Sequence, residues 1–170
     1  MSGMQTARTV LQQGALRQGV VVLAGVLAMG ATPEAFSQTT SGSVWVTPGF
    51  YTHHFDRNRE LRDANPGLGL EYRLSTDIRL TAGRFINSDN AYSSYLGFYY
   101  QPLRFASVQW GTAVGLFNGY PNAFGGGWFP AILPTATWEG RSLGVNVAFI
   151  PPLQNRLYGG VSLQIKYRLR

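Results

Sequence analysis

From about residue 44 to its end, the chain alternates apolar residues with small or polar ones at a period of two. This period is typical of β-strands whose two faces meet different surroundings, because successive side chains point to opposite sides of a sheet. The final segment shows one apolar face made of Val161, Leu163, Ile165, Tyr167 and Leu169. The alternation predicts eight strands, at residues 44–54, 67–74, 78–86, 94–101, 106–117, 129–138, 143–150 and 158–169.

The segments between these strands are alternately short and long. Tight turns are expected at residues 75–77, 101–104 and 139–142. Longer loops are expected at residues 55–65, 87–93, 118–127 and 151–157. This alternation is typical of outer-membrane barrels, and small or polar residues on the second face fit a narrow lumen better than the surface of a soluble sandwich. We therefore expect an all-β protein, an eight-stranded antiparallel transmembrane β-barrel of the outer membrane.

The N-terminal segment has the features of a secretory signal peptide. Arg8 and Arg17 precede an apolar run at residues 19–31, and small residues precede Gln38. This apolar run is too short to cross a bilayer as a helix. We therefore expect residues 1–37 to be a cleaved signal peptide and residues 38–170 to form a single outer-membrane β-barrel domain.

Composition narrows the range of partners. The chain has a net charge of +6 and no cysteine, so an exported protein of this composition has no disulfide framework. Its basic charge favours anionic lipid headgroups and lipopolysaccharide phosphates over nucleic acid. Aromatic residues make up 14% of the chain, a content that fits interfacial girdles. The tryptophans expected in such girdles, near predicted strand ends, are Trp45, Trp110, Trp128 and Trp138.

Several prolines fall where a β-ladder would be weakened, because proline has no N–H to donate. Pro48 lies inside the first predicted strand and Pro66 precedes the second. Pro130 opens the sixth and Pro151 follows the seventh. One interpretation is that missing hydrogen bonds open lateral gaps, between strands one and two and between six and seven, that admit a lipid tail. The simpler alternative is a set of strand-end prolines with no shared role.

Residues 129–152, "FPAILPTATWEGRSLGVNVAFIPP", resemble the corresponding stretch of the PagP family, the lipid A palmitoyltransferases of the outer membrane. The resemblance covers about residues 44–169, and the four prolines above match the family's gate prolines in order and approximate spacing. It implies an enzyme that moves a palmitoyl or similar chain from a phospholipid donor to lipid A in the outer leaflet of a Gram-negative outer membrane. We accordingly expect a membrane-embedded monomer without cofactor, metal or nucleic acid.

The chain has two histidines, His53 and His54. In the family, the functional histidine follows the first gate proline by five residues, and this spacing favours His53 as the base. Adjacent residues on a strand point to opposite faces, so only one of the two is expected in a site, and the same divergence argues against a shared metal ion. His54 stays open as the alternative, as does a surface histidine without a role.

The family also carries an Asp-Ser pair after its third strand. Here the matching stretch, residues 85–88, is "FINS", which places Ser88 at the serine position and Asn87 at the aspartate position. The resemblance implies Ser88 as nucleophile or polar partner and Asn87 as the group that orients the histidine. Asparagine cannot supply the negative charge that stabilises an imidazolium. Asp89 is a candidate substitute, and a decayed or repurposed site remains an alternative.

Arginines in the first long loop, Arg57 and Arg59 together with Arg62, either bind lipid A phosphates or are solvated loop charges. Three functions therefore compete: a lipid A acyltransferase, a non-enzymatic barrel with a lipid-binding or structural role, and a lipid A deacylase that uses water as acceptor. The second is favoured by Asn87 and by the lack, in residues 38–42, of the amphipathic helix with which the family begins.

Overall fold

The computed structural model describes residues 42–122, 124–153 and 158–169. The predicted signal peptide, residues 1–37, lies outside this part of the chain. No helix in the described part is both long and apolar enough to cross a membrane. The elements are β1 (Val44–His54), β2 (Ala64–Arg73), β3 (Ile78–Ile86), β4 (Tyr92–Phe105), β5 (Val108–Phe117), the short 3-10 helix η1 (Phe124–Gly126), β6 (Phe129–Glu139), β7 (Leu143–Ile150) and β8 (Gly160–Leu169).

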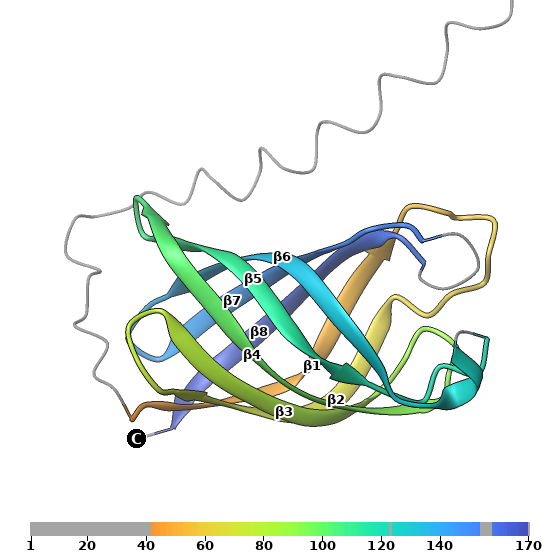
Figure 1. Ribbon diagram of the computed structural model, residues 1–170, viewed down its shortest axis with the longest axis horizontal. Helices are drawn as coiled ribbons and strands as arrows, with labels where there is room; N and C mark the ends of the chain where they lie inside the picture. Colours follow the sequence, from red (N-terminus) through yellow and green to blue (C-terminus); the bar gives the residue numbers. More distant parts are fainter. Residues whose placement is uncertain (1–41, 123, 154–157, 170) are drawn as a thin grey trace, which may run out of the picture. The chain divides into compact units, whose positions relative to one another are not determined.

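The eight strands form one closed antiparallel barrel, in which each strand pairs with the next and β8 pairs with β1 (Figure 1). The predicted eight-stranded barrel is thus confirmed. Short turns at 74–77, 106–107 and 140–142 join the strands at one end, which we call the turn end. Connections at 55–63, 87–91, 118–128 and 151–159 join them at the other, the loop end, on the right in Figure 1.

Several predicted boundaries differ from the structure, most by one or two residues, and two differ by more. The turn expected at residues 101–104 lies inside β4, which continues to Phe105. Pro102 sits in an irregularity of the β4–β5 ladder, so this proline interrupts the strand without ending it. β2 begins at Ala64 rather than at residue 67.

Apolar side chains of the strands lie on the outer surface of the barrel, and polar ones line its lumen. Leu68, Leu96 and Ile132, for example, are 65%, 60% and 66% exposed. Among the described residues, eighteen buried side chains are polar or charged, whereas five are apolar or aromatic. This inversion of the soluble pattern is compatible with a barrel that spans an outer membrane.

Five buried charged residues fill the lumen at the turn end, and we call them the turn-end cluster: Glu71, Arg73, Arg79, Glu139 and Lys166. Lys166 pairs with Glu71 and, at 2.7 Å between Nζ and Oε1, with Glu139. The ring of Trp45 lies beside this cluster, 5.0 Å from Lys166 Nζ, and is 0% exposed. Trp45 therefore lies in the lumen, and its predicted place in an outer aromatic girdle is wrong.

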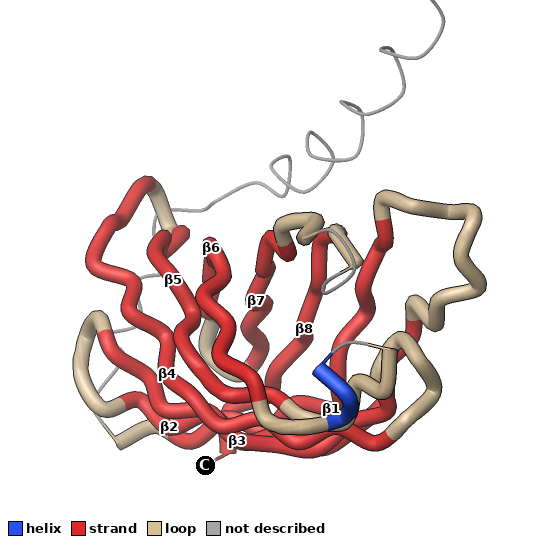
Figure 2. The backbone as a smooth tube through the Cα atoms, turned by 45° about the vertical axis from the view of Figure 1, so that its right-hand side comes forward, coloured by secondary structure: helices blue, strands red, loops and turns tan. Residues whose placement is uncertain are grey.

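Toward the loop end the lumen is lined by aromatic rings. Phe50 packs edge-on against Phe85, with ring centroids 4.9 Å apart, and lies 5.5 Å from Tyr95. Tyr95 stacks in turn on Phe117, with centroids 5.8 Å apart. Figure 2 shows the strands around the lumen, with the connection between β1 and β2 extending beyond their ends. The lumen thus changes from charged to apolar between its two ends.

Candidate functional site

An irregularity in β1 decides which histidine faces the lumen. The ladder with β8 pairs Val46 with Tyr167 and resumes at Tyr51 with Leu163, so β1 contains one residue more than β8 in between. Gly49 lies in this interval with φ of 122°. Such a bulge reverses the alternation of faces beyond it, because side chains along a strand have a period of two.

The reversal places His54 in the lumen and His53 outside. Trp45 and Thr47 point inward before the bulge, whereas Thr52 and His54 are the buried residues after it. The structure therefore makes His54 the candidate for the site. The spacing after Pro48 had favoured His53. The preference for His53 rested on the five-residue spacing of the family, and that spacing takes no account of the bulge.

His54 joins Ser88 and Asp63 in one chain of hydrogen bonds. The distance from His54 Nε2 to Ser88 Oγ is 2.9 Å, and that from His54 Nδ1 to Asp63 Oδ1 is also 2.9 Å. His54 and Ser88 are 3% and 7% exposed. With the Nδ1 proton donated to Asp63, Nε2 can accept the proton of the Ser88 hydroxyl. This arrangement, which we call the triad, is the one that activates serine for acyl transfer.

Asp63 supplies the negative charge that Asn87 lacks. Burial disfavours its charged form, but hydrogen bonds from His54 and Arg57, together with their charges, outweigh burial and hold the pKa of the carboxyl below its ordinary value. Arg57 donates from Nη1 to Asp63 Oδ2 at 2.9 Å. Asp63 is therefore ionised at neutral pH and can stabilise an imidazolium at His54.

Asn87 does not contact either histidine among the described interactions. It is 0% exposed and holds the turn that carries Ser88. Its side chain accepts from the backbone N–H groups of Asp89 and Ala91, at 2.9 and 3.0 Å, and donates to the Ser93 hydroxyl and the Gly119 carbonyl oxygen, at 2.8 and 2.5 Å. The residue expected to orient the histidine thus positions the serine instead.

The other candidate carboxylate, Asp89, lies next to Tyr158. Burial and the neighbouring Asp89 carboxylate both raise the pKa of the Tyr158 hydroxyl. No interaction between Asp89 and His54 occurs among the described residues. The functional residue that the sequence interpretation missed is therefore Asp63, which stands at the end of the first long loop, immediately before β2.

The four prolines lie at two seams that differ. The β6–β7 ladder extends from Thr135–Ala148 to Glu139–Gly144. In the described pairing, the loop-end half of β6, which includes Pro130, is bonded to β5 alone, and Pro151 directly follows β7. We call this segment the unpaired seam, and it lies where a gap was predicted.

The β1–β2 seam is not open in the same way. Its ladder shifts beside Pro48 and continues from Gly49–Pro66 to Tyr51–Ala64. The backbone N–H of Thr52 also donates to the carbonyl oxygen of residue 63, at 2.8 Å. The proline in β1 therefore bends one seam, and the predicted gap between strands one and two is replaced by a bulge.

All three arginines considered for phosphate binding already have partners. Arg62 Nη1 donates to Asn90 Oδ1 at 3.0 Å, and the exposed Arg57 and Arg59 pair with carboxylates. Arg57 bonds to Asp63, while Arg59 Nε lies 3.2 Å from Asp56 Oδ2. The Arg59 guanidinium also lies 5.3 Å from the centroid of the Tyr158 ring. Arg57 and Arg59 therefore help to order the loop above the triad, and a role toward phosphate stays a prediction.

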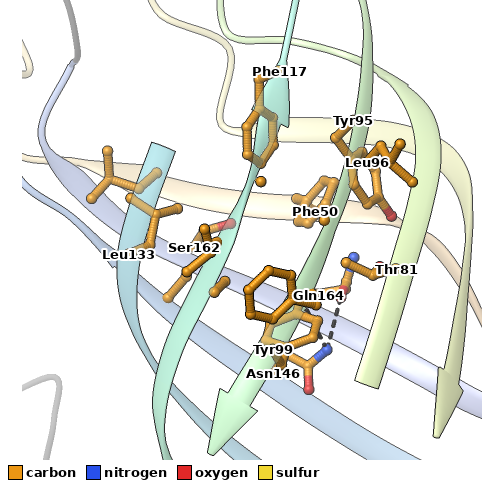
Figure 3. A pocket seen from close by; sticks show the side chains of 17 residues that line it. Phe50, Thr81, Tyr95, Leu96, Tyr99, Phe117, Leu133, Asn146, Ser162 and Gln164 are labelled. Carbon is orange, nitrogen blue, oxygen red and sulfur yellow. Dashed lines mark hydrogen bonds between the residues drawn. The ribbon is translucent and has the colours of Figure 1, made fainter. Parts of the chain in front are cut away.

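A cavity of about 90 Å³ lies in the lumen between the aromatic rings and the turn-end cluster. Small and apolar residues, among them Ala113, Gly115 and Ala148, form much of its wall. Its polar side includes Asn146, whose Nδ2 donates to Gln164 Oε1 at 2.9 Å (Figure 3). The cavity is thus suited to an apolar group rather than to a charged one.

Within the described residues, no group of three or more His, Asp or Glu side chains could hold a metal ion. A scan of the sequence against models of protein families finds no match, and a search of curated proteins finds none either. The interpretation of the site therefore rests on its geometry.

Proposed function

We propose that the protein is an outer-membrane acyltransferase that moves a palmitoyl or similar chain from a phospholipid to lipid A, as the resemblance to the PagP family implies. The observation that carries this proposal is the buried triad at the loop end of the lumen, beside the section that aromatic rings line. His54 lies 2.9 Å from both of its partners, and serine, imidazole and carboxylate together are suited to acyl transfer.

The position of the triad favours lipid substrates. An apolar outer surface favours insertion in the outer membrane, with the long connections at the cell surface. The triad then lies near the headgroups of the outer leaflet. The unpaired seam between β6 and β7 gives an acyl chain a route from the bilayer toward the lumen, where aromatic and aliphatic residues can bury it.

In the first half of the proposed reaction, Ser88 Oγ attacks the ester carbonyl of the phospholipid while His54 Nε2 takes the serine proton. The tetrahedral intermediate collapses with cleavage of the bond between the carbonyl carbon and the glycerol oxygen. His54 returns the proton to that oxygen, and a lysophospholipid leaves. The acyl chain is then held as an ester of Ser88.

In the second half, a lipid A hydroxyl attacks the Ser88 ester and gives its proton to His54. Cleavage of the ester bond releases acylated lipid A, and the proton returns from His54 to Ser88 Oγ. Asp63 keeps the Nδ1 proton in place and stabilises the imidazolium in both halves. Because Asp63 is charged, the asparagine at position 87 does not count against activity.

The test is expression in a bacterium that lacks lipid A palmitoylation, with mass spectrometry of its lipid A. The wild-type protein should add the mass of one acyl chain. His54→Ala should lower the product by about 100-fold or more, the typical contribution of a general base, and Ser88→Ala should abolish it. His53→Ala is the matched control, because it removes the adjacent imidazole, which faces outward, and should change the product less than about threefold, as expected of a surface substitution.

Each other outcome contradicts a defined part of the proposal. Loss of activity in His53→Ala but not in His54→Ala would remove the triad from the reaction. A protein that is folded in the outer membrane but adds no acyl chain would be a non-enzymatic barrel. Loss of an acyl chain from lipid A would identify a deacylase that uses the same three residues.

A further inference from the structure

The outer wall of the barrel carries one charged side chain in a field of apolar ones. Along β3, the outward positions are Ile78, Leu80, Ala82, Arg84 and Ile86. Among the outward-facing positions of the described strands, Arg84 alone has a charged side chain. It lies close to the loop end, one outward position before the end of β3. This placement needs an explanation, because a guanidinium that faces hydrocarbon is costly.

Arg84 has no carboxylate partner among the described residues. Its guanidinium carbon lies 4.6 Å from the centroid of the Tyr92 ring, and no hydrogen bond or ion pair joins it to another described side chain. Directly across the β3–β4 ladder stands Ser94, whose hydroxyl also lacks a hydrogen-bond partner in the described part of the chain. Tyr92 is 66% exposed. A cation, a hydroxyl and a tyrosine therefore share one exposed place on the wall.

Apolar residues surround this place on the sides away from the loop end. Leu68 pairs with Arg84 across the β2–β3 ladder, and Leu96 is the next outward residue of β4. They are 65% and 60% exposed. Tyrosine and arginine beside such a belt mark the depth at which acyl chains meet headgroups. The anions available at that depth are lipid phosphates, and a guanidinium binds phosphate oxygens in a bidentate manner.

We propose that Arg84, Ser94 and Tyr92 form a docking site for a phosphate group of lipid A in the outer leaflet. The proposal rests on the proposed function in placing the loop end at the cell surface. Lipid A fits better than a phospholipid because its phosphate monoesters carry more charge at neutral pH than a phosphodiester does.

The docking site is also close to the triad in the sequence. Ser88 follows Arg84 by four residues, in the turn beyond the end of β3. A lipid A molecule held at Arg84 is thus placed at the β3–β4 side of the barrel, whereas the unpaired seam lies between β6 and β7. Acceptor and donor lipids therefore approach from different sides and do not compete for one entrance.

The test measures lipid binding by the full barrel domain in detergent micelles, by native mass spectrometry, in a Ser88→Ala background that cannot turn over. Arg84→Gln should lower the fraction of protein carrying bisphosphorylated lipid A by about tenfold, the size expected for a lost charge-assisted contact. Ser94→Ala should lower it less. Arg141→Gln is the matched control, since Arg141 is also exposed but lies in a turn at the turn end, and it should leave binding unchanged.

Binding measurements with other ligands identify which phosphate the site recognises. Lipid A without its phosphates should bind equally to the wild-type wall and to Arg84→Gln. Unchanged binding of bisphosphorylated lipid A to Arg84→Gln would overturn the proposal. An equal loss of phosphatidylglycerol binding would assign the site to phospholipid phosphate, and displacement by equimolar inorganic phosphate would assign it to free phosphate, so either would overturn the lipid A assignment. Because binding is measured without turnover, these results are separate from the outcome of the acyltransferase test.

Discussion

His54 contacts a hydroxyl with one ring nitrogen and a carboxylate with the other. This double contact fixes both the orientation of the ring and the tautomer that leaves Nε2 free to accept a proton. The side chain that decides its chemistry is Asp63, because the hydrogen bond and charge of this carboxylate determine whether an imidazolium can be stabilised. The protonation chemistry of His54 therefore depends on the charge of Asp63.

The charge of Asp63 gives a pH-dependent prediction. Burial opposes ionisation of Asp63, but His54 and Arg57 hold its pKa below the ordinary value of 3.8. A lowered folded-state pKa contributes stability above the unfolded pKa, and this contribution is lost as pH falls through the folded value. Asp63→Asn should therefore be less stable than the wild type at pH 6, and the difference should shrink below about pH 4, as the linkage relation requires. Unfolding midpoints in urea between pH 6 and pH 2 measure it.

The control for this experiment is Asp56→Asn, because Asp56 is 50% exposed and pairs with Arg59 in the same loop. It should show little difference at any pH, since exposed ion pairs contribute little. A stability difference for Asp63→Asn that persists unchanged at pH 2 would contradict the assigned charge.

Residue by residue, the sequence located part of the site. The two histidines are conspicuous because the chain has no others, whereas Ser88 was placed by the resemblance of residues 85–88 to the PagP family. Asp63 was not identified, because Asp56 and Glu60 occupy the same polar loop and alternation says nothing about loop residues. The choice among three carboxylates is made by the path of the loop, which only the three-dimensional structure gives.

At the scale of elements, the turn between β3 and β4 depends on one amide. Asn87 uses both its acceptor and its donor groups, and an aspartate could not donate to Ser93 and Gly119. Asn87→Asp should therefore lower the free energy of unfolding by about 1–3 kcal/mol, the cost of lost buried hydrogen bonds, although aspartate is the residue that the resemblance to the PagP family leads one to expect at this position. Urea unfolding of the folded barrel measures this.

The same variant tests whether a carboxylate at position 87 can take over the role of the carboxylate at position 63. Asn87→Asp should not restore acyl transfer to Asp63→Asn, because no described contact joins position 87 to a histidine. The measurement is the lipid A product of the double variant beside that of each single one. Recovery of activity in the double variant would show that position 87 can orient the histidine.

The bulge in β1 gives a prediction about backbone conformation. Gly49 has φ of 122°, and a Cβ there would overlap the carbonyl oxygen of Asn65. Gly49→Ala should therefore destabilise the barrel by about 1–3 kcal/mol, the cost of a strained backbone position. Gly127→Ala is the control, because the nearest atom to a Cβ at that position is 3.4 Å away. Equal unfolding free energies for the two variants would contradict the role of Gly49.

The extents of several strands were predictable from alternation. β1, β3 and β7 match their predicted bounds, and most of β8 does, because alternation shows where a strand runs even where a bulge or a single inverted position interrupts it. The bulge beside Pro48 and the irregularity at Pro102 were not predictable in the same way, since a proline marks a weak place in a ladder without saying whether the strand ends, bends or loses a partner.

At the scale of the whole barrel, the turn-end cluster contains three cations and two carboxylates. Lys166 is 0% exposed and forms ion pairs with both Glu71 and Glu139. Lys166→Met should cost about 3–5 kcal/mol in unfolding free energy, because it removes one partner from two buried ion pairs and leaves Glu71 and Glu139 with only their arginine contacts. The measurement is urea unfolding, with Arg141→Met as an exposed control that should shift stability by less than about 0.5 kcal/mol. A neutral result for Lys166→Met would mean that water or a rearranged arginine compensates the carboxylates.

The barrel itself was predictable because its polar face is as regular as its apolar face. Glu71 and Lys166 fall on the small or polar faces expected to line a lumen, although nothing in the pattern showed that they would meet. Partners of this kind lie 95 residues apart in sequence, and only closure of the sheet between β1 and β8 brings the two strands into one wall.

The adjacent histidines and the bulge that precedes them have an evolutionary consequence. Insertion or loss of one residue between positions 46 and 51 would turn His54 outward and His53 inward, because the faces of a strand exchange with every single-residue slip. A lineage with only one histidine would lose its base in such an event. With two adjacent histidines, one imidazole faces the lumen in either register, and counting residues from Pro48 misassigns the lumen-facing histidine wherever the bulge has been gained or lost.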